Sequence, residues 1–584
     1  MKRLQYLFIA ITFGATSFAQ KNDTTVVTHS VNIEKDFTPQ IMKVKRTDID
    51  LPTTEPEIPK TEVVYGEETK PIETTTPFNP LQQSDLKIMK RNQYKDGFAR
   101  IGFGIPIQWM AELWYPIKSN SDYFDIHLKH YGVHIKDNKQ LLDTKLDFTY
   151  KKDFQQNQLY TTAGISNEYF NYYGIDSIFI GEDYNINDSK VIGDSLLPTL
   201  QSITESDITI GLKSIGNSVT WNYDGNINYH LLATTARLKE HAISLNLTAG
   251  YNLDNGNLLK TDLNATVYAY NLPTLSALLL DSTWKTQALI TLSPRYERSY
   301  RNLAIKVGAK IWFSINKDRA VSIAPDVELR YTIAKIFNIY GGVTGDYKFT
   351  SMSQILNENR YFDISSQLEK NDYTPFNFFA GFNLKPVHGL VFDGYISYQM
   401  IYNTHFFYNK QFDCLETPNQ WPDKKDSERV YGNVFTVDYA RATLFTAEAR
   451  LAYNLKDRYN AHIQAKYNGW DVLTENIQAW NKPTWEINTG IDARITKNLA
   501  INSSFYYASQ RIVKLPNTDG SLSKRTLNPI YDLNFSASYT FNKNWSLFVE
   551  ANNVLSLSKK LRYEEWYGYK SIGTNILFGA SIAF

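Results

Sequence analysis

Apolar and polar side chains alternate strictly along much of the chain after residue 95. From Tyr531 to Phe541 the apolar side chains occupy the odd positions, and Asp, Asn, Ser and Thr occupy the even positions. The final residues, from Ile572 to Phe584, place apolar side chains at even positions in the same manner. Successive side chains of a strand point to opposite faces, so this period of two predicts strands with one apolar and one polar face.

Three features of these runs favour a membrane barrel over a soluble sandwich. The runs last about 10 to 13 residues, which suits tilted strands that cross a bilayer. Aromatic residues such as Trp109 and Tyr251 stand at run ends, where their rings can reach the headgroup level. Short links such as 541–544 mostly alternate with longer ones such as 350–375 and 408–440, which is the rhythm of periplasmic turns and external loops.

The repeated runs predict an all-β fold. We expect residues 96–584 to form a closed antiparallel transmembrane β-barrel of about 22 strands. Closure is expected because an open sheet edge in hydrocarbon would leave a row of unpaired amides. An even strand number would place both ends of the barrel in the periplasm.

The first 95 residues differ in texture from the rest. Lys2 and Arg3 precede an apolar run that ends in the small residues Ser17 and Ala19, which predicts a signal peptide over residues 1–19. The next stretch is rich in Thr, Glu, Lys and Pro, so no regular element is expected there. Residues 20–95 are therefore predicted to form an extended periplasmic tail.

Composition excludes several classes of protein. The charges of the 61 basic and 60 acidic residues nearly cancel, so the protein has no strong positive electrostatic field that could bind nucleic acid. Cys414 is the single cysteine, which excludes a disulfide scaffold. No stretch after the leader reaches the roughly 18 apolar residues of a membrane helix.

The C-terminal stretch resembles the end of TonB-dependent receptor barrels, in the branch common in Bacteroidota. The resemblance rests on the run 548–555, the loop Tyr567 to Tyr569 and a terminal Phe584 on an alternating strand. That last residue is similar to the signal read by the barrel assembly machinery. The resemblance implies the outer membrane of a Gram-negative bacterium, contact with its lipid, and a role in solute passage.

A second match to the same family lies near the start of the tail. The hexamer resembles the TonB box, through which these receptors pair with TonB as an added strand, although an unremarkable flexible start explains it as well. One part of the family pattern is missing, because residues 20–95 are too short and too rich in proline for a plug domain. The hexamer consists of Asp23, Thr24, Thr25, Val26, Val27 and Thr28.

Charged side chains of both signs fall on the polar face of the predicted strands. They either line a polar passage or pair along the inner wall and keep it hydrated. On the outward face each Lys or Arg would cost about 2 to 4 kcal/mol near the bilayer centre. Parity directs the following toward the lumen: Lys129, Lys145, Asp147, Lys306, Lys310, Glu448, Arg450, Lys466, Glu486, Asp492, Arg494, Asp532 and Glu550.

The sequence offers no enzyme chemistry that we can assign. On one strand His127 would face opposite to His130 and His134, so these histidines are not expected to bind one metal ion. There is no Gly-x-Ser-x-Gly, HExxH or phosphate-binding glycine loop. We therefore expect no enzyme, no cofactor and no metal site.

Two functions remain open. The first is a barrel that conducts, or helps to conduct, a solute across the outer membrane, with TonB or another periplasmic or surface protein as a partner. The alternative is a non-transporting scaffold that anchors an outer-membrane complex. In either case the aromatic side chains of the long links could stack on sugars, dock a surface partner or cap the interface; they include Phe407, Trp480, Trp566 and Tyr567.

Overall fold

The computed structural model describes most of the chain after residue 96. The described residues do not include the predicted signal peptide, the tail with its TonB-box-like hexamer, or Cys414. The signal peptide, the tail and the hexamer therefore stay predictions. The described range is 97–584, apart from 120, 136–138, 172–199, 216–219, 236–237, 254–255, 272–285, 317–318, 335, 365, 367, 410–433, 456–457, 517–520 and 543.

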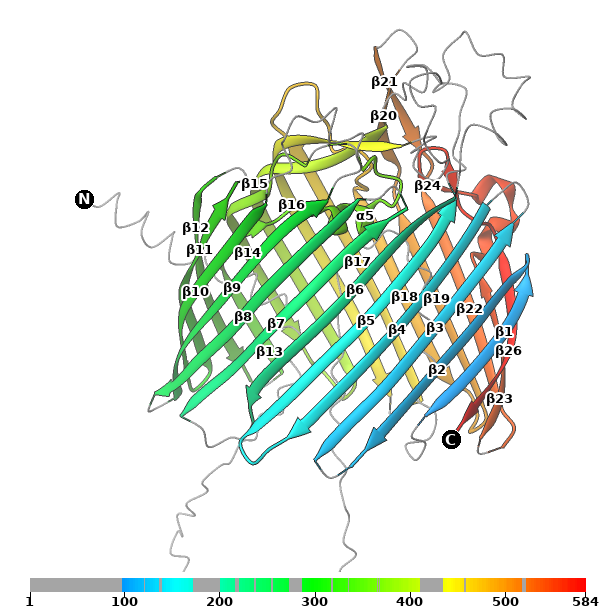
Figure 1. The fold of residues 1–584 in the computed structure, drawn as a ribbon, viewed down its shortest axis with the longest axis horizontal. Helices are drawn as coiled ribbons and strands as arrows, with labels where there is room; N and C mark the ends of the chain where they lie inside the picture. Colours follow the sequence, from blue (N-terminus) through cyan, green and yellow to red (C-terminus); the bar gives the residue numbers. More distant parts are fainter. Residues whose placement is uncertain are drawn as a thin grey trace, which may run out of the picture. The chain divides into compact units, whose positions relative to one another are not determined.

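The described residues form a closed antiparallel barrel of 22 strands (Figure 1). This confirms the predicted fold and strand number. The barrel strands are β1 (Phe98–Ile105), β2 (Gln108–Lys118), β3 (Asp122–Ile135), β4 (Lys139–Asp153), β5 (Asn157–Asn171), β6 (Leu200–Ser214), β7 (Trp221–Thr234), β8 (Lys239–Leu253), β9 (Asn257–Asn271), β10 (Gln287–Tyr300), β11 (Leu303–Ile315), β12 (Val321–Ile333), β13 (Phe337–Lys348), β14 (Asp372–Leu384), β15 (Leu390–Asn409), β16 (Phe435–Leu455), β17 (Tyr459–Val472), β18 (Trp485–Arg494), β19 (Leu499–Ala508), β22 (Ile530–Thr540), β23 (Trp545–Asn552) and β26 (Asn575–Ala583).

Closure occurs between the first and the last strand. β1 pairs with β2 on one side and with β26 on the other, from Phe98 opposite Ala583 to Ile105 opposite Ile576. Beyond these pairs, the backbones of Gly97 and Phe584 exchange two hydrogen bonds of 3.0 Å. The sheet therefore has no free edge along this seam, as the argument from unpaired amides requires.

The two ends of the barrel differ in their connections. At one end, where Gly97 and Phe584 meet, every link between barrel strands is short, as at 334–336 and 541–544. At the other end several connections are long, including 349–371 and 553–574. We call these the short-link end and the long-connection end; the latter is at the top of Figure 1.

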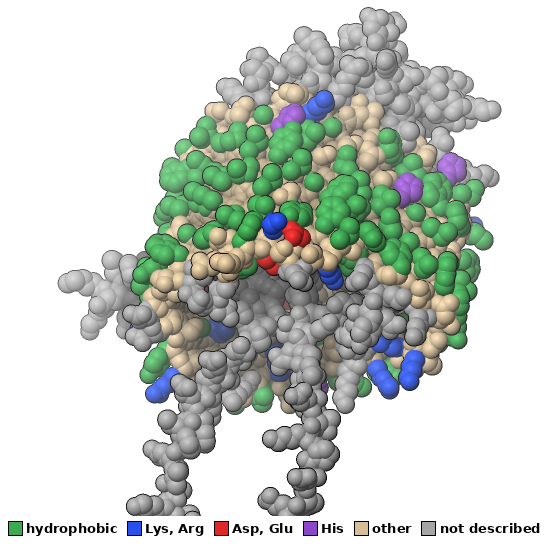
Figure 2. Space-filling model, turned by 60° about the horizontal axis from the view of Figure 1, so that its bottom comes forward, with side chains coloured by type: hydrophobic (Ala, Val, Ile, Leu, Met, Phe, Trp, Pro, Cys, Tyr) green, Lys and Arg blue, Asp and Glu red, His purple; other side chains and the backbone are tan. Residues whose placement is uncertain are grey.

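The wall of the barrel has opposite polarity on its two faces. Ile243, Leu245 and Leu247 of β8 are exposed, whereas Glu240 and Ala242, at even positions of the same strand, are buried. Hydrophobic side chains form a broad band on the outward face (Figure 2). An apolar outward face and a polar inner face are typical of membrane barrels.

Small elements follow several barrel strands at the long-connection end. Among the described residues, no helix is long and apolar enough to cross a membrane. The small elements are α5 (Met352–Glu358), β20 (Arg511–Pro516), β21 (Leu522–Leu527), η7 (Val554–Leu557), η8 (Lys559–Leu561), β24 (Glu564–Trp566) and β25 (Tyr569–Lys570).

Candidate functional site at the long-connection end

The described residues of the β13–β14 connection, 349–371 without 365 and 367, fold back against the inner face of the barrel. Its helix α5 begins after Ser351, whose hydroxyl accepts a hydrogen bond of 3.2 Å from the Gln354 N–H. The Gln354 side chain in turn accepts one from the Ser351 N–H, which completes a capping box. Because Met352 and Ile355 are buried, the short helix is fixed by its cap and by packing.

Three glutamates on β5, β6 and β8 hold this connection by polar contacts. Glu240 Oε2 accepts a hydrogen bond of 2.7 Å from the Met352 N–H. The Ser353 hydroxyl donates to Glu205 Oε1 at 2.6 Å. Glu168 forms an ion pair with Arg360 of the connection. The three glutamates share the parity that faces inward on their strands, so the connection lies on the lumen side of this wall.

A fourth carboxylate ties the connection to another part of the molecule. Glu358, the last residue of α5, accepts from Lys482 Nζ at 2.8 Å and lies 2.9 Å from His405 Nε2. Burial alone would raise the pKa of Glu358, but attraction to Lys482 and His405 lowers it below its ordinary value. β9 to β14 separate β8 from β15 in the barrel order, so the connection joins parts of the wall that are not neighbours.

An apolar core surrounds the β13–β14 connection. Phe362 is fully buried, and the rings of Tyr361 and Tyr569 stack with their centroids 3.5 Å apart. The buried residues of the core come from four barrel strands, β5, β7, β15 and β16, from links between strands and from the 553–574 connection. Its buried members are Phe170, Leu232, Leu238, Met352, Ile355, Leu356, Tyr361, Phe362, Ile364, Leu368, Phe407, Val434, Phe435, Trp566 and Tyr569.

This packing removes several aromatic side chains that the sequence offered as binding groups. Phe407 and Trp566 belong to the core just described, and Trp480 packs with Phe406 in a second cluster. Tyr567 is buried with residues of β20 and β21. These four rings are therefore packing residues.

The charged side chains expected in the lumen all lie on barrel strands. Several form ion pairs along the wall, such as Lys306 with Asp326 at 2.9 Å and Glu550 with Arg100 at 3.2 Å. A role for them in a passage stays a prediction. They are Lys129 on β3; Lys145 and Asp147 on β4; Lys306 and Lys310 on β11; Glu448 and Arg450 on β16; Lys466 on β17; Glu486, Asp492 and Arg494 on β18; Asp532 on β22; and Glu550 on β23.

His127 and His130 of β3 have separate partners. His127 Nε2 lies 2.8 Å from Glu112 Oε1, and His130 accepts a hydrogen bond of 2.9 Å from the Trp109 indole N–H. In the part of the chain that the structure describes, no group of three or more His, Cys, Asp or Glu side chains could hold a metal ion.

The glutamates that hold the connection were not predicted from the sequence. Glu168, Glu205 and Glu240 have the inward parity of their strands, but they bond to residues more than 100 positions away, as in the pair Glu205 and Ser353. One local signal was available: Ser351 followed by Gln354 is a capping-box pattern inside a long link, and it predicts a helix there.

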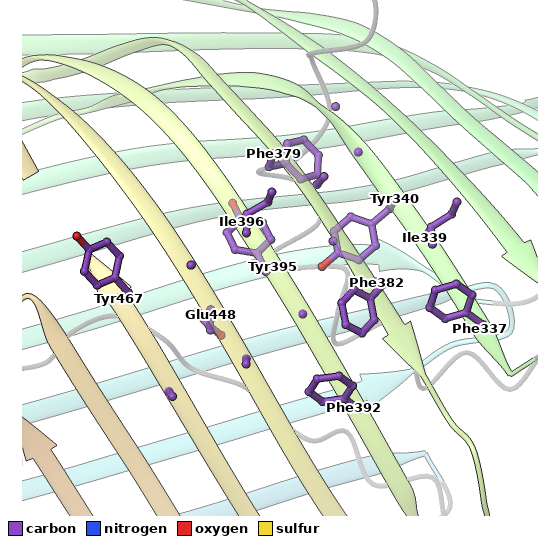
Figure 3. Close-up of a pocket in the computed structure, with 18 of the residues that line it drawn as sticks. Phe337, Ile339, Tyr340, Phe379, Phe382, Phe392, Tyr395, Ile396, Glu448 and Tyr467 are labelled. Carbon is purple, nitrogen blue, oxygen red and sulfur yellow. The ribbon is translucent and has the colours of Figure 1, made fainter. Parts of the chain in front are cut away.

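A hollow of about 920 Å³ lies on the wall formed by β12 to β18. Figure 3 shows the rings of Phe337, Phe382 and Phe392 close to one another in its lining. A Cβ at Gly394 would lie 2.3 Å from Cε1 of Phe382, so glycine lets this ring rest on the strand. Ile396 is exposed on the same wall. The hollow therefore opens mainly on the outward face rather than on the inner one.

Comparison with known proteins supports the fold. No family model and no curated relative matches the chain. Among solved structures, the siderophore receptor PirA from Acinetobacter baumannii has a TM-score of 0.60 at 10% identity, over 85% of this chain and 81% of that one. The pyoverdine outer membrane receptor FpvA from Pseudomonas aeruginosa gives 0.58 at 11%, over 85% and 79%. The FrpB iron transporter from Neisseria meningitidis gives 0.59 at 10%, over 84% and 81%.

Proposed function

We propose that this protein is a bacterial outer-membrane barrel that conducts, or helps to conduct, a solute. The observation that carries the proposal is the closed 22-stranded barrel with an apolar outward face and a charged inner face. A barrel of this size encloses more volume than its own wall side chains fill. The long-connection end would face the outside, and both termini would lie in the periplasm.

The named neighbours support this assignment at the level of fold. They are a siderophore receptor, a pyoverdine outer membrane receptor and an iron transporter, and none of these names describes an enzyme. The likeness does not extend to a particular solute, because the sequences are only 10 to 11% identical. We therefore propose passage of a solute without naming siderophores as the cargo.

TonB is the partner that the tail would engage. Residues 23–28 resemble the TonB box, and their β-branched side chains suit the addition of a strand to a sheet. Val26→Pro removes a backbone donor from such a strand and should abolish any TonB-dependent phenotype. Val63→Pro, in the same tail but outside the hexamer, is the matched control. An unchanged phenotype in Val26→Pro would remove TonB from the proposal.

Conductance across planar bilayers tests the passage itself. Purified full-length protein should form stable channels, and deletion of residues 20–95 should enlarge them if the tail partly fills the lumen. Channels that are absent from both proteins would refute passive conduction.

A non-transporting scaffold is the second candidate, and the packed long-connection end favours it. There the 349–371 connection is fixed against the inner face by both polar and apolar contacts. A scaffold would show no conductance in either protein and would co-purify with a stable partner complex from the outer membrane.

A further inference from the structure

The 349–371 connection combines two properties that a movable closure requires. It touches separate parts of the wall, and its polar anchors are hydrogen bonds and ion pairs that water can replace. From these contacts we infer that it is a gate: it closes the long-connection end in the state seen here and must move away for a solute to pass. The inference rests on the proposed passage function, and its test below can fail separately.

The first support is the placement of the anchors. Glu168, Glu205 and Glu240 reach the connection from β5, β6 and β8, while Lys482 and His405 reach it from beyond β14. Contacts from separate parts of the wall hold a segment across an opening, whereas contacts from one strand pair would only fold it along the wall.

The second support is the chemistry of those anchors. They are hydrogen bonds and ion pairs to carboxylates, which water can replace once the segment leaves. Glu240 is fully buried in the closed state and accepts from two backbone N–H groups, those of Met352 and Ser353. Removing the hydrogen-bond partners of a carboxylate that stays buried is costly. The anchors should therefore be released together, when the whole segment moves away and water reaches the carboxylates.

The third support is the shape of the apolar packing. α5 presents Met352, Ile355 and Leu356 to the core, and Phe362 follows it after a short turn. The packing makes the closed state the stable one in the absence of a ligand or an energising partner. The open state would be a minor one whose population a ligand could raise.

A cysteine beneath the gate provides the assay. In a Cys414→Ser background, Asn246→Cys places a thiol on the inner face of β8, six residues and about 20 Å along the strand from Glu240. A membrane-impermeant maleimide is added outside intact bacteria, and the rate of labelling is measured. Leu522→Cys, which is exposed at the long-connection end, should be labelled rapidly in every variant and verifies orientation.

The gate is weakened by removing three charges. Combining Glu168→Gln, Glu205→Gln and Glu240→Gln should speed labelling of the inner thiol by about tenfold to a hundredfold, because hydrogen bonds to charged groups are the stronger ones.

A matched control removes three charges from the inner wall without touching the gate. Glu112, Glu297 and Glu328 pair with arginines of the wall, and changing them together to Gln should leave the labelling rate unchanged.

A second variant weakens the gate without changing charge. Ile355→Ala removes a buried side chain of α5 and should also speed labelling, while the Leu522→Cys control still shows that the protein has reached the cell surface. The inference is overturned when the inner thiol is labelled at the same rate in wild-type protein and in both variants. If the variants are labelled faster but the protein shows no conductance in planar bilayers, the gate is supported and the proposed solute passage is refuted.

Discussion

The barrel wall and the long-connection end are built on opposite rules. In the wall, apolar side chains such as Ile243 and Ile227 point outward and are exposed, while polar side chains point inward. In the core around the 349–371 connection, Phe362 and Phe435 are buried and pack against other apolar side chains. The wall follows the rule of a protein in lipid and the core follows that of a protein in water.

This difference teaches where each part obtains its stability. The wall is held by backbone ladders that run around the ring, so its strands depend on their neighbours more than on a core. The long-connection end depends on a cluster of packed rings, like a small soluble domain. A substitution that is severe in one region should therefore be mild in the other.

The largest expected effect is in the packed core. Phe362→Ala leaves a cavity and should destabilise the closed connection by about 3 to 5 kcal/mol, the usual cost for a buried phenylalanine. Amide hydrogen exchange across residues 349–371 should speed up by at least about a hundredfold. Phe103→Ala, at an exposed position of β1, is the control and should leave that exchange unchanged. Equal exchange in both variants would contradict a packed core.

The next effect concerns the wall. Ile243→Lys places a charge on the outward face and should lower the free energy of unfolding in lipid vesicles by about 2 to 4 kcal/mol near the bilayer centre. Urea titration followed by tryptophan fluorescence measures the change. Ser244→Lys, one residue along and on the inner face, should cost much less. Equal costs at the two positions would mean that the outward face does not meet hydrocarbon.

A smaller effect is expected at the start of α5. Ser351→Ala removes the hydroxyl that accepts from the Gln354 N–H, and loss of such a cap costs about 1 kcal/mol. Exchange should rise at the first amides of α5, while the strands of the wall keep their protection. Ser351→Asp, which can cap the helix, should restore slow exchange.

Acid should loosen the connection through Glu358. Its pKa is lowered below the ordinary value of 4.5, so its ion pairs contribute fully above about pH 4.5 and are lost as the pH falls through the lower folded value. Protease cleavage within 349–371 should therefore increase from about pH 4.5 downward. Glu358→Gln should flatten this part of the profile. A profile that Glu358→Gln leaves unaltered would assign the acid response to other groups.

The wall could be predicted from the sequence because its signal is local. The alternation from Tyr531 to Phe541 coincides with β22, Ile530–Thr540, within one residue at each end. Each position reports its own face, so no knowledge of distant partners is required. The strand number followed from counting such runs.

The packed end could not be predicted because its signal is not local. β15 and β16 have 20 and 21 residues, longer than a bilayer requires, since their outer parts join the core. Glu205 and Ser353 are 148 residues apart in sequence, and nothing near either residue indicates the other. The long link around 350–375 was expected to be an external loop, but a link that points inward has the same composition.

The seam between β1 and β26 has a consequence for the order of assembly. Phe98 lies opposite Ala583, so this ladder joins residues at nearly the greatest separation that the barrel allows. Contacts between residues so far apart in sequence form late and slowly, after hairpins between neighbouring strands have formed. The ring should therefore be completed in a final cooperative step. Until β1 and β26 meet, each of these strands should be paired with another protein in the assembly intermediates.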